Sequence, residues 1–167
     1  QSVLVFDAVG VDRIGFGEVV PPSDGEHAMI KNLYETYKGI QPKNVQESYH
    51  DALQGLEESR SLFKFGYLTL RDLARAEKLH WQCCEKIHSL VKRMPRVPEE
   101  LQSLDEQLGS IYYCNFSLFQ SAPDIWAMDQ LFPFMPIHRL EEEPTIKARL
   151  ADLTCASDGM IDHFLDV

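Results

Sequence analysis

The chain has 167 residues, of which 44% are hydrophobic and 25% are charged, a composition typical of a globular protein with room for one ordinary domain. With 26 acidic and 16 basic residues, its net charge of −10 disfavours a nucleic-acid partner. The sequence has no apolar run of about 18 residues and no export signal, so we expect no membrane span, a cytoplasmic location and reduced cysteines.

The N-terminal pattern predicts a β-strand followed by a loop. Residues 2–10 are a short, valine-rich apolar run that ends at Gly10, as in a buried strand. Glycines and prolines are frequent over residues 11–25, which predicts a loop. The chain starts at Gln1 beside one apolar run and ends within another, so we expect the polypeptide to continue at both ends.

The next part of the chain predicts four amphipathic helices. Apolar residues recur at helical spacing over residues 26–39 and 43–58. A long helix is expected from a capping box at Thr69 and Asp72 to a point before Pro95, and a fourth helix follows over residues 98–108. The residues predicted to be buried are Ile30, Leu33, Tyr34, Tyr37, Val45, Tyr49, Ala52, Leu53, Leu56, Leu70, Leu73, Ala76, Leu79, Ile87, Leu101, Leu104 and Leu108.

After Ser110 the pattern returns to β-structure. A short helical segment is expected over residues 121–131, from Pro123 onwards, and Asp158-Gly159 is a typical hairpin turn. The predicted strands cover residues 111–119, 134–140, 147–154 and 160–167.

This order predicts an α+β fold. Strands of a β-domain, from residues 1–25 and 111–167, are interrupted by a four-helix insertion over residues 26–110. Four amphipathic helices need a common core, so the insertion is expected to be a helical bundle, which also offers a face for self-association. The strand–helix alternation of a cofactor-binding (β/α)8 barrel is absent from the sequence.

Cys155 is the strongest candidate for chemistry among the four cysteines. It lies at the end of a predicted strand, before a tight turn, where a thiol can face a cleft and have its pKa lowered by a nearby cation. The alternative is a half-buried cysteine that stabilises a hairpin. Asp124 is either a wall residue facing a cationic ligand or a first-turn acid favoured by the helix dipole. Asp158 is either a ligand or simply a good residue before glycine in a turn.

A metal site on the long helix is a weaker possibility. His80, Cys84 and His88 are spaced four residues apart, as zinc ligands can be, but no fourth ligand is evident nearby. We therefore expect these side chains to be packed or solvated.

The residues between Tyr113 and His163 carry the most specific pattern. They include CNFSLFQSAPDIW (114–126), DQLFP (129–133), PIHRL (136–140) and DLTCASDGMIDH (152–163). This succession resembles the C-terminal β-domain of the biosynthetic arginine decarboxylases, enzymes several times longer than this chain that use pyridoxal phosphate. The resemblance implies an internal segment of such an enzyme, without the part that holds the cofactor.

The resemblance also implies roles for particular residues. It implies that Cys155 stands at the active site of a partner subunit and protonates the carbanion left when carbon dioxide departs, which is general-acid work. It implies that Gln120 and Asp124 lie near the active site as part of the substrate wall. Family members usually have an acid directly after the cysteine, which helps to hold the cationic end of the substrate, but this chain has Ala156. Either Asp158 or another carboxylate then carries that role, or the substrate binds poorly.

The implied reaction is the conversion of L-arginine to agmatine and carbon dioxide, the first step of one route to polyamines such as spermidine. The full-length enzyme would use pyridoxal phosphate and Mg²⁺ and form a homo-oligomer, a dimer or a tetramer, with the helical insertion among its contacts. The isolated chain is expected to be inactive and to bind neither cofactor. The alternative is a non-catalytic interaction module derived from such an enzyme, which would not need the acid that Ala156 replaces. A third option, regulation by a cationic small molecule, has only the net charge behind it.

Overall fold

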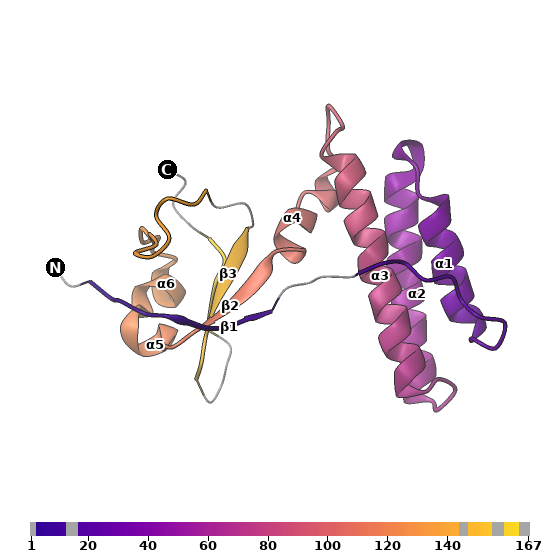
Figure 1. Ribbon diagram of the computed structural model, residues 1–167, viewed down its shortest axis with the longest axis horizontal. Coiled ribbons are helices and arrows are strands. Elements are labelled where there is room, and N and C mark those ends of the chain that lie inside the picture. Colours follow the sequence, from indigo (N-terminus) through magenta and orange to yellow (C-terminus); the bar gives the residue numbers. More distant parts are fainter. Residues whose placement is uncertain (1–2, 13–16, 144–146, 155–158, 164–167) are drawn as a thin grey trace. The chain divides into compact units, whose positions relative to one another are not determined.

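The structure is a computed structural model that describes residues 3–12, 17–143, 147–154 and 159–163 (Figure 1). Backbone contacts divide the chain into two units. The helical unit comprises Gly15–Leu108, and the β unit comprises Gln1–Ile14 with Gly109–Val167. The helical unit is thus inserted into the sequence of the β unit, and the predicted α+β fold is confirmed.

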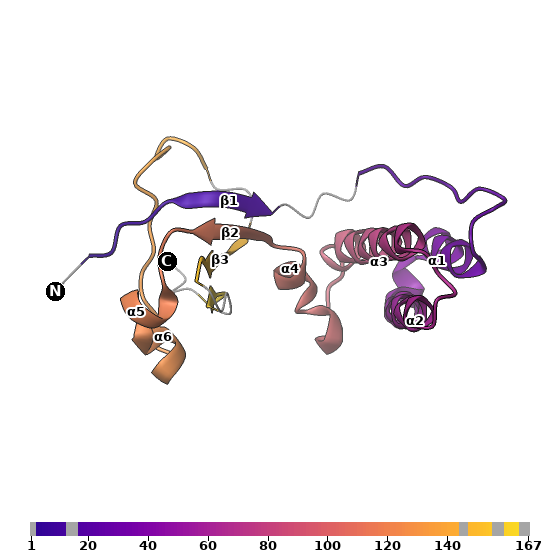
Figure 2. The same cartoon turned by 90° about the horizontal axis from the view of Figure 1, so that it is seen from below.

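The β unit is built on a four-stranded sheet in the order β1-β2-β3-β4. Strand β1 pairs antiparallel with β2, β2 pairs parallel with β3, and β3 pairs antiparallel with β4. A parallel pair requires a crossover, and the crossover between β2 and β3 contains the short helices α5 and α6 (Figure 2). The bounds are β1 Ala8–Asp12, β2 Ser110–Cys114, α5 Leu118–Ser121, α6 Pro123–Met128, β3 Ala148–Asp152 and β4 Met160–Ile161.

Four of the predicted strands differ from the structure. Of the strand predicted over residues 160–167, β4 covers only Met160–Ile161, and residues 164–167 lie outside the described residues. Residues 134–140 form no strand, because Pro133 and Pro136 lack the N–H groups that a ladder needs and Arg139 has a φ of 55°. The strand predicted over residues 111–119 ends at Cys114, and α5 begins at Leu118 instead. The strand predicted over residues 2–10 is displaced, since pairing starts only at Ala8.

A small core holds the β unit together. Cys114, Phe116, Leu118 and Ile161 are buried in one cluster, and the ring of Phe6 packs on Phe116 with 4.9 Å between centroids. Strand β1 itself is mostly exposed, so its predicted burial is wrong. It lies at the edge of the sheet, and among the described strands it pairs only with β2.

The helical unit contains three long helices, each of which packs against the other two. Figure 2 shows them nearly end on. The predicted fourth helix is reduced to two single turns, a 3₁₀ turn and α4. Leu101 and Leu104 of this segment are nevertheless buried. The bounds are α1 Ala28–Gly39, a 3₁₀ turn Pro42–Asn44, α2 Val45–Lys64, α3 Leu70–Val91, a 3₁₀ turn Glu99–Leu101 and α4 Leu104–Gln107.

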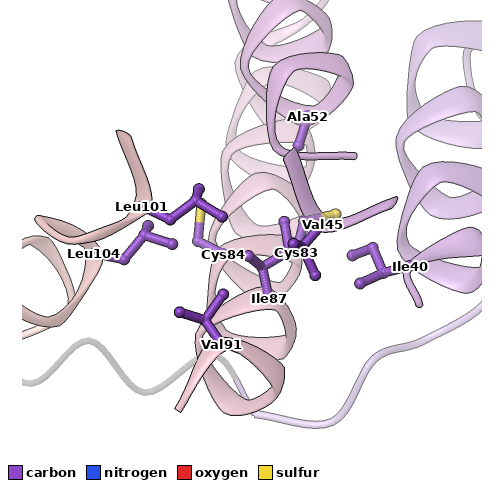
Figure 3. Close-up of a cluster of buried hydrophobic side chains, with 9 residues drawn as sticks. All are labelled: Ile40, Val45, Ala52, Cys83, Cys84, Ile87, Val91, Leu101 and Leu104. Atoms are coloured by element: carbon purple, nitrogen blue, oxygen red, sulfur yellow. The ribbon is translucent and has the colours of Figure 1, made fainter. Parts of the chain in front are cut away.

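The main core of this unit lies between α2, α3 and the chain around α4 (Figure 3). Because the leucines of the short fourth segment reach this cluster, the segment is held by packing rather than by its own helical length. The buried members are Ile40, Val45, Ala52, Cys83, Cys84, Ile87, Val91, Leu101 and Leu104.

Most of the helical residues predicted to be buried are buried or half-buried, but two are exposed. Leu53 is 41% exposed and Leu70 is 69% exposed, so their predicted burial is wrong. Leu70 is the first residue of α3, beyond the reach of the core. The predicted capping box is confirmed, since the Asp72 N–H donates to Thr69 Oγ1 over 3.2 Å and the Thr69 N–H donates to Asp72 Oδ2 over 2.9 Å.

The loop before α1 groups with the helices rather than with the β unit. Gln82 of α3 donates to the carbonyl of Gly17 over 3.3 Å, and Arg75 Nε binds Glu26 over 3.3 Å. These contacts fasten the loop to α3, although the predicted insertion begins only at residue 26. Within the described residues, none of the helices has the length and apolar character needed to cross a membrane.

Candidate active site

A buried aspartate stands where strand β3 ends. Asp152 is 1% exposed, and its Oδ2 accepts a 2.9 Å hydrogen bond from the N–H of Leu118, the first residue of α5. The Thr154 hydroxyl donates to Oδ1 of the same carboxylate over 3.3 Å. The carboxylate thus caps α5 and ties this helix to the chain that leads to Cys155.

Gly159 is in direct contact with Asp152 on the other side of the same segment. Its carbonyl oxygen accepts a 2.9 Å hydrogen bond from the Asp152 N–H. A Cβ atom on residue 159 would lie 2.4 Å from Asp152 Oδ2, so there is no room for a side chain. Asp152, which directly precedes Leu153, therefore holds Gly159, which directly follows Asp158.

Cys155 and Asp158, the predicted proton donor and one predicted substrate ligand, lie outside the described residues, as does Ala156. Their roles stay predictions. The structure describes the frame on either side of them, which is formed by Asp152 and Gly159.

The two other predicted substrate ligands lie on the short helices after β2. Gln120 is in α5 and Asp124 is in the first turn of α6, and both are exposed. The bond between Leu118 and Asp152 brings the helix that carries Gln120 to the strand leading to Cys155. In the described part of the chain, no ion pair or hydrogen bond involves the Asp124 carboxylate, and a first-turn acid also suits the helix dipole. Both interpretations of Asp124 therefore stay open.

Two aromatic side chains, one from α5 and one from α6, contact each other. The rings of Phe119 and Trp126 meet edge to face with 5.5 Å between centroids. Both side chains are partly exposed, at 41% and 57%. They provide an apolar surface near Gln120 in sequence, of the kind on which the methylene stem of a long cationic side chain packs.

Cys114 lies in the core of the same unit, where its thiol is unsuited to the proton donation predicted for Cys155. It is 1% exposed, and burial raises the pKa of its thiol. A buried thiol with a raised pKa is a poor proton carrier near neutral pH.

Sequence reasoning missed Asp152. Its signal is an acid that directly follows an apolar strand, Leu150-Ala151, and precedes another apolar residue, Leu153. Such an acid can be buried only if its carboxylate is hydrogen-bonded, and the partner, Leu118, is 34 residues away in the chain.

The helical residues weighed as metal ligands separate into two environments. His80 Nε2 lies 3.6 Å from Cys84 Sγ, while His80 Nδ1 bonds the Ala52 carbonyl over 3.1 Å. His88 instead contacts Asp105 over 3.0 Å. Burial raises the pKa of Cys84 to about 12, and no cluster of three potential ligands occurs among the described residues. These side chains pack the bundle.

The described residues contain one four-stranded sheet and separate helices, without the strand–helix alternation of a (β/α)8 barrel. The expectation that this segment binds no pyridoxal phosphate stays a prediction.

Comparison with known proteins gives a consistent family. A family model described as the arginine decarboxylase helical bundle domain matches residues 23–105. The biosynthetic arginine decarboxylase of Gloeobacter violaceus is 60% identical over 100% of this chain and 26% of its own length. That of a Nostoc species is 53% identical over 100% of the chain and 25% of its own length.

A solved structure agrees with the sequence matches. The crystal structure of the biosynthetic arginine decarboxylase of Campylobacter jejuni matches with a TM-score of 0.70 and 35% identity, over 95% of this chain and 26% of that one. The chain spans about a quarter of the length of the relatives that it matches. From end to end it corresponds to one segment of these proteins, and it belongs to the biosynthetic arginine decarboxylase family.

Proposed function

We propose that this chain is a segment of an enzyme that converts L-arginine to agmatine and carbon dioxide, and that it supplies the proton donor, part of the substrate wall and an oligomerisation bundle. The observation that carries the proposal is the 60% identity to a biosynthetic arginine decarboxylase over the whole chain. The fastening of Asp152 to Leu118 and to Gly159 supports it, because a proton donor at Cys155 needs a defined position.

Cys155 is the proposed proton donor. After carbon dioxide leaves, the substrate carbon needs a proton, and a thiol with a pKa near the working pH can deliver it. Pyridoxal phosphate, the electron sink of such reactions, would be held by a part of the enzyme outside this chain, together with Mg²⁺. Each active site would be completed by the Cys155 segment of a neighbouring subunit, which makes a dimer or a tetramer part of the proposal.

The substrate wall is proposed to be acidic. A guanidinium group donates two parallel hydrogen bonds to a carboxylate, so Asp158 and Asp124 are the candidate ligands, with the Gln120 amide beside them. Ala156 accepts no hydrogen bond through its side chain. A weak substrate affinity is therefore expected unless Asp158 takes over the role.

A cytoplasmic location stays a prediction of the sequence.

The test is agmatine formation by the longer polypeptide that carries this segment. Cys155→Ala is expected to lower turnover by about 10²–10⁴-fold, the usual contribution of a general acid. Ala156→Asp is expected to lower KM for L-arginine, and the neighbouring Ser157→Ala serves as the matched control. Unchanged turnover in Cys155→Ala, or agmatine production by the isolated 167-residue chain, would contradict the proposal.

A second candidate function rests on Ala156. A non-catalytic module derived from the enzyme would not need an acid after Cys155, and it would act by binding decarboxylase subunits or another protein. The intact mass of the native polypeptide separates the two. A mass several times 19.2 kDa favours the enzyme, whereas a mass near 19.2 kDa favours the module.

A further inference from the structure

The turn between α2 and α3 exposes a cluster of large apolar side chains. Phe65, Tyr67 and Leu70 are 76%, 72% and 69% exposed, while Leu68 between them is buried. We call Phe65, Tyr67 and Leu70 the hairpin tip. Neighbouring exposed aromatic and aliphatic side chains on a soluble domain are typical of an interaction surface.

The backbone of the hairpin tip is held on both sides. Gly66 has a φ of 80°, its N–H donates to the Phe63 carbonyl over 2.9 Å, and the Tyr67 N–H donates to the Leu62 carbonyl over 2.9 Å. This pair of bonds is a Schellman motif, which ends α2 sharply. The capping box at Thr69 then starts α3. The exposed side chains thus stand on a preorganised turn, which lowers the entropy cost of docking.

A shallow groove runs along the adjoining outer face of α2. Its volume is about 390 Å³, and we call it the α2 groove. Its walls combine two carboxylates with apolar surface from Leu62 and Phe65, so they suit a partner that brings both apolar side chains and a cation. The lining residues are Gln54, Glu57, Glu58, Ser61, Leu62 and Phe65.

Two oppositely charged residues of α2 lie at equal distances in sequence on either side of a small residue. Glu58 lies three residues before Ser61, and Lys64 lies three residues after it. Lys64 makes no ion pair with any residue that the structure describes, and Glu58 accepts only the side-chain amide of Gln54, over 2.7 Å. If two α2 helices cross antiparallel at Ser61, each Glu58 faces the Lys64 of the other copy. A two-fold interface repeats every contact in this way.

We infer that the hairpin tip and the α2 groove form a two-fold interface with a second copy of this chain, in which the tip of each copy covers the groove of the other. Two Glu58–Lys64 pairs then set the antiparallel register, and Phe65 and Tyr67 supply the apolar contact. This inference rests on the proposed homo-oligomer and names its contact surface in the helical unit.

The test is the association of the 167-residue chain, measured by sedimentation equilibrium. The chain is expected to reach twice the 19.2 kDa mass of one copy. Glu58→Lys and Lys64→Glu are each expected to weaken dimerisation about tenfold, because each reversal creates two like-charge contacts. The double variant Glu58→Lys/Lys64→Glu is expected to return to within about threefold of the parent, since the pairs re-form in the opposite sense.

An apolar substitution provides the second arm. Phe65→Ser is expected to weaken dimerisation about a hundredfold, because it removes an aromatic anchor from both copies. Matched controls are Val20→Ser and Lys43→Glu, two exposed residues of the same unit away from the tip and the groove, which are expected to leave association unchanged. Circular dichroism checks that each variant is folded.

Two results would overturn the inference. A chain that stays monomeric at high concentration rules out a second copy as the occupant of the groove. A chain that associates equally well in every variant has its interface elsewhere, for example at the exposed strand β1. Agmatine formation by the longer polypeptide is measured separately, so a failure of the decarboxylase proposal is distinguishable from a failure of this interface.

Discussion

The carboxylate of Asp152 lies against the backbone of Gly159, with only 2.4 Å between its Oδ2 and the point where a Cβ of residue 159 would stand. The same oxygen accepts the N–H of Leu118. Asp152 therefore holds α5 through its carboxylate and Gly159 through its backbone N–H.

Removing the Asp152 carboxylate is expected to destabilise the β unit. In Asp152→Ala, the N–H of Leu118 loses its partner in a buried place, which costs about 1–3 kcal/mol of unfolding free energy. Urea denaturation followed by near-ultraviolet circular dichroism measures the change. The exposed Glu141→Ala in the same unit is the control, and its effect is expected to stay within about 0.5 kcal/mol. Equal effects of the two substitutions would contradict the assigned role.

A side chain at position 159 is expected to conflict with Asp152. Gly159→Ala should lower the unfolding free energy by about 1–3 kcal/mol, because the carboxylate cannot retreat without losing its bond to Leu118. The measurement is a double-mutant cycle with Asp152→Ala. The methyl group should cost less once the carboxylate is gone, whereas strictly additive effects would show that the two residues do not interact.

Gly55 is a second position where close packing, here of α1 on α2, favours glycine over a residue with a side chain. Alanine is normally favoured over glycine in a helix by about 1 kcal/mol. At Gly55, however, a Cβ would lie 2.7 Å from Leu33 Cδ2 and 3.1 Å from its Cγ. We therefore expect Gly55→Ala to lower the melting temperature, with a net loss of about 1 kcal/mol.

The control for this prediction is Gly39→Ala, because a Cβ there meets nothing within 4 Å. It is expected to be neutral or slightly stabilising. In a Leu33→Ala background, Gly55→Ala should become favourable, since the methyl group then fills the vacated space. A stabilising Gly55→Ala in the parent chain would refute the close contact.

The helical unit is expected to lose stability as the pH falls below the ordinary histidine range. Burial lowers the pKa of His80 from 6.5, although its hydrogen bond to the Ala52 carbonyl opposes the shift. The unfolded chain therefore takes up the proton at a higher pH than the folded chain. The resulting stability is fully present above about pH 6.5 and is lost as the pH falls towards the lower folded pKa.

Urea denaturation between neutral pH and about pH 5 measures this loss, in a window above the ordinary carboxyl values. The carboxyls of Asp72 and Glu100 have lowered pKa values, so their contributions disappear only at more acidic pH. His80→Gln should flatten the dependence in this window, and the exposed His138→Gln should not. A pH profile that His80→Gln leaves unchanged would contradict the prediction.

Thiol labelling is expected to show that Cys155 reacts faster than the other cysteines. Burial raises the pKa of Cys83 and of Cys84 from 9.0 to about 12, which lowers the thiolate fraction about a thousandfold, and it also raises the pKa of Cys114. Iodoacetamide should therefore modify the native chain at Cys155 first, as mass spectrometry of peptides can show. In urea all four should react alike. Native labelling that favours Cys83 or Cys84 would contradict the burial, and a slow Cys155 would weaken its proposed role.

Local features of the sequence were enough to predict the three long helices. The stripes through Ile30 and Ala76 and the capping box at Thr69 act within a few residues of the chain, so spacing alone located α1, α2 and α3. The hairpin signal at Asp158-Gly159 likewise agrees with the antiparallel pairing of β3 and β4. The catalytic roles of Cys155 and Asp158 rest on the family resemblance and stay predictions.

Long-range contacts decided the rest. The sequence determined by itself the three long helices and the family to which the chain belongs, because periodicity, capping and motif order are written along the chain. Only the tertiary structure decided that Asp152 is buried, that Leu70 faces outward and that residues 134–140 form no strand. Burial and strand pairing depend on partners that are distant in sequence, such as Leu118 for the Asp152 carboxylate, and no local pattern specifies such a partner.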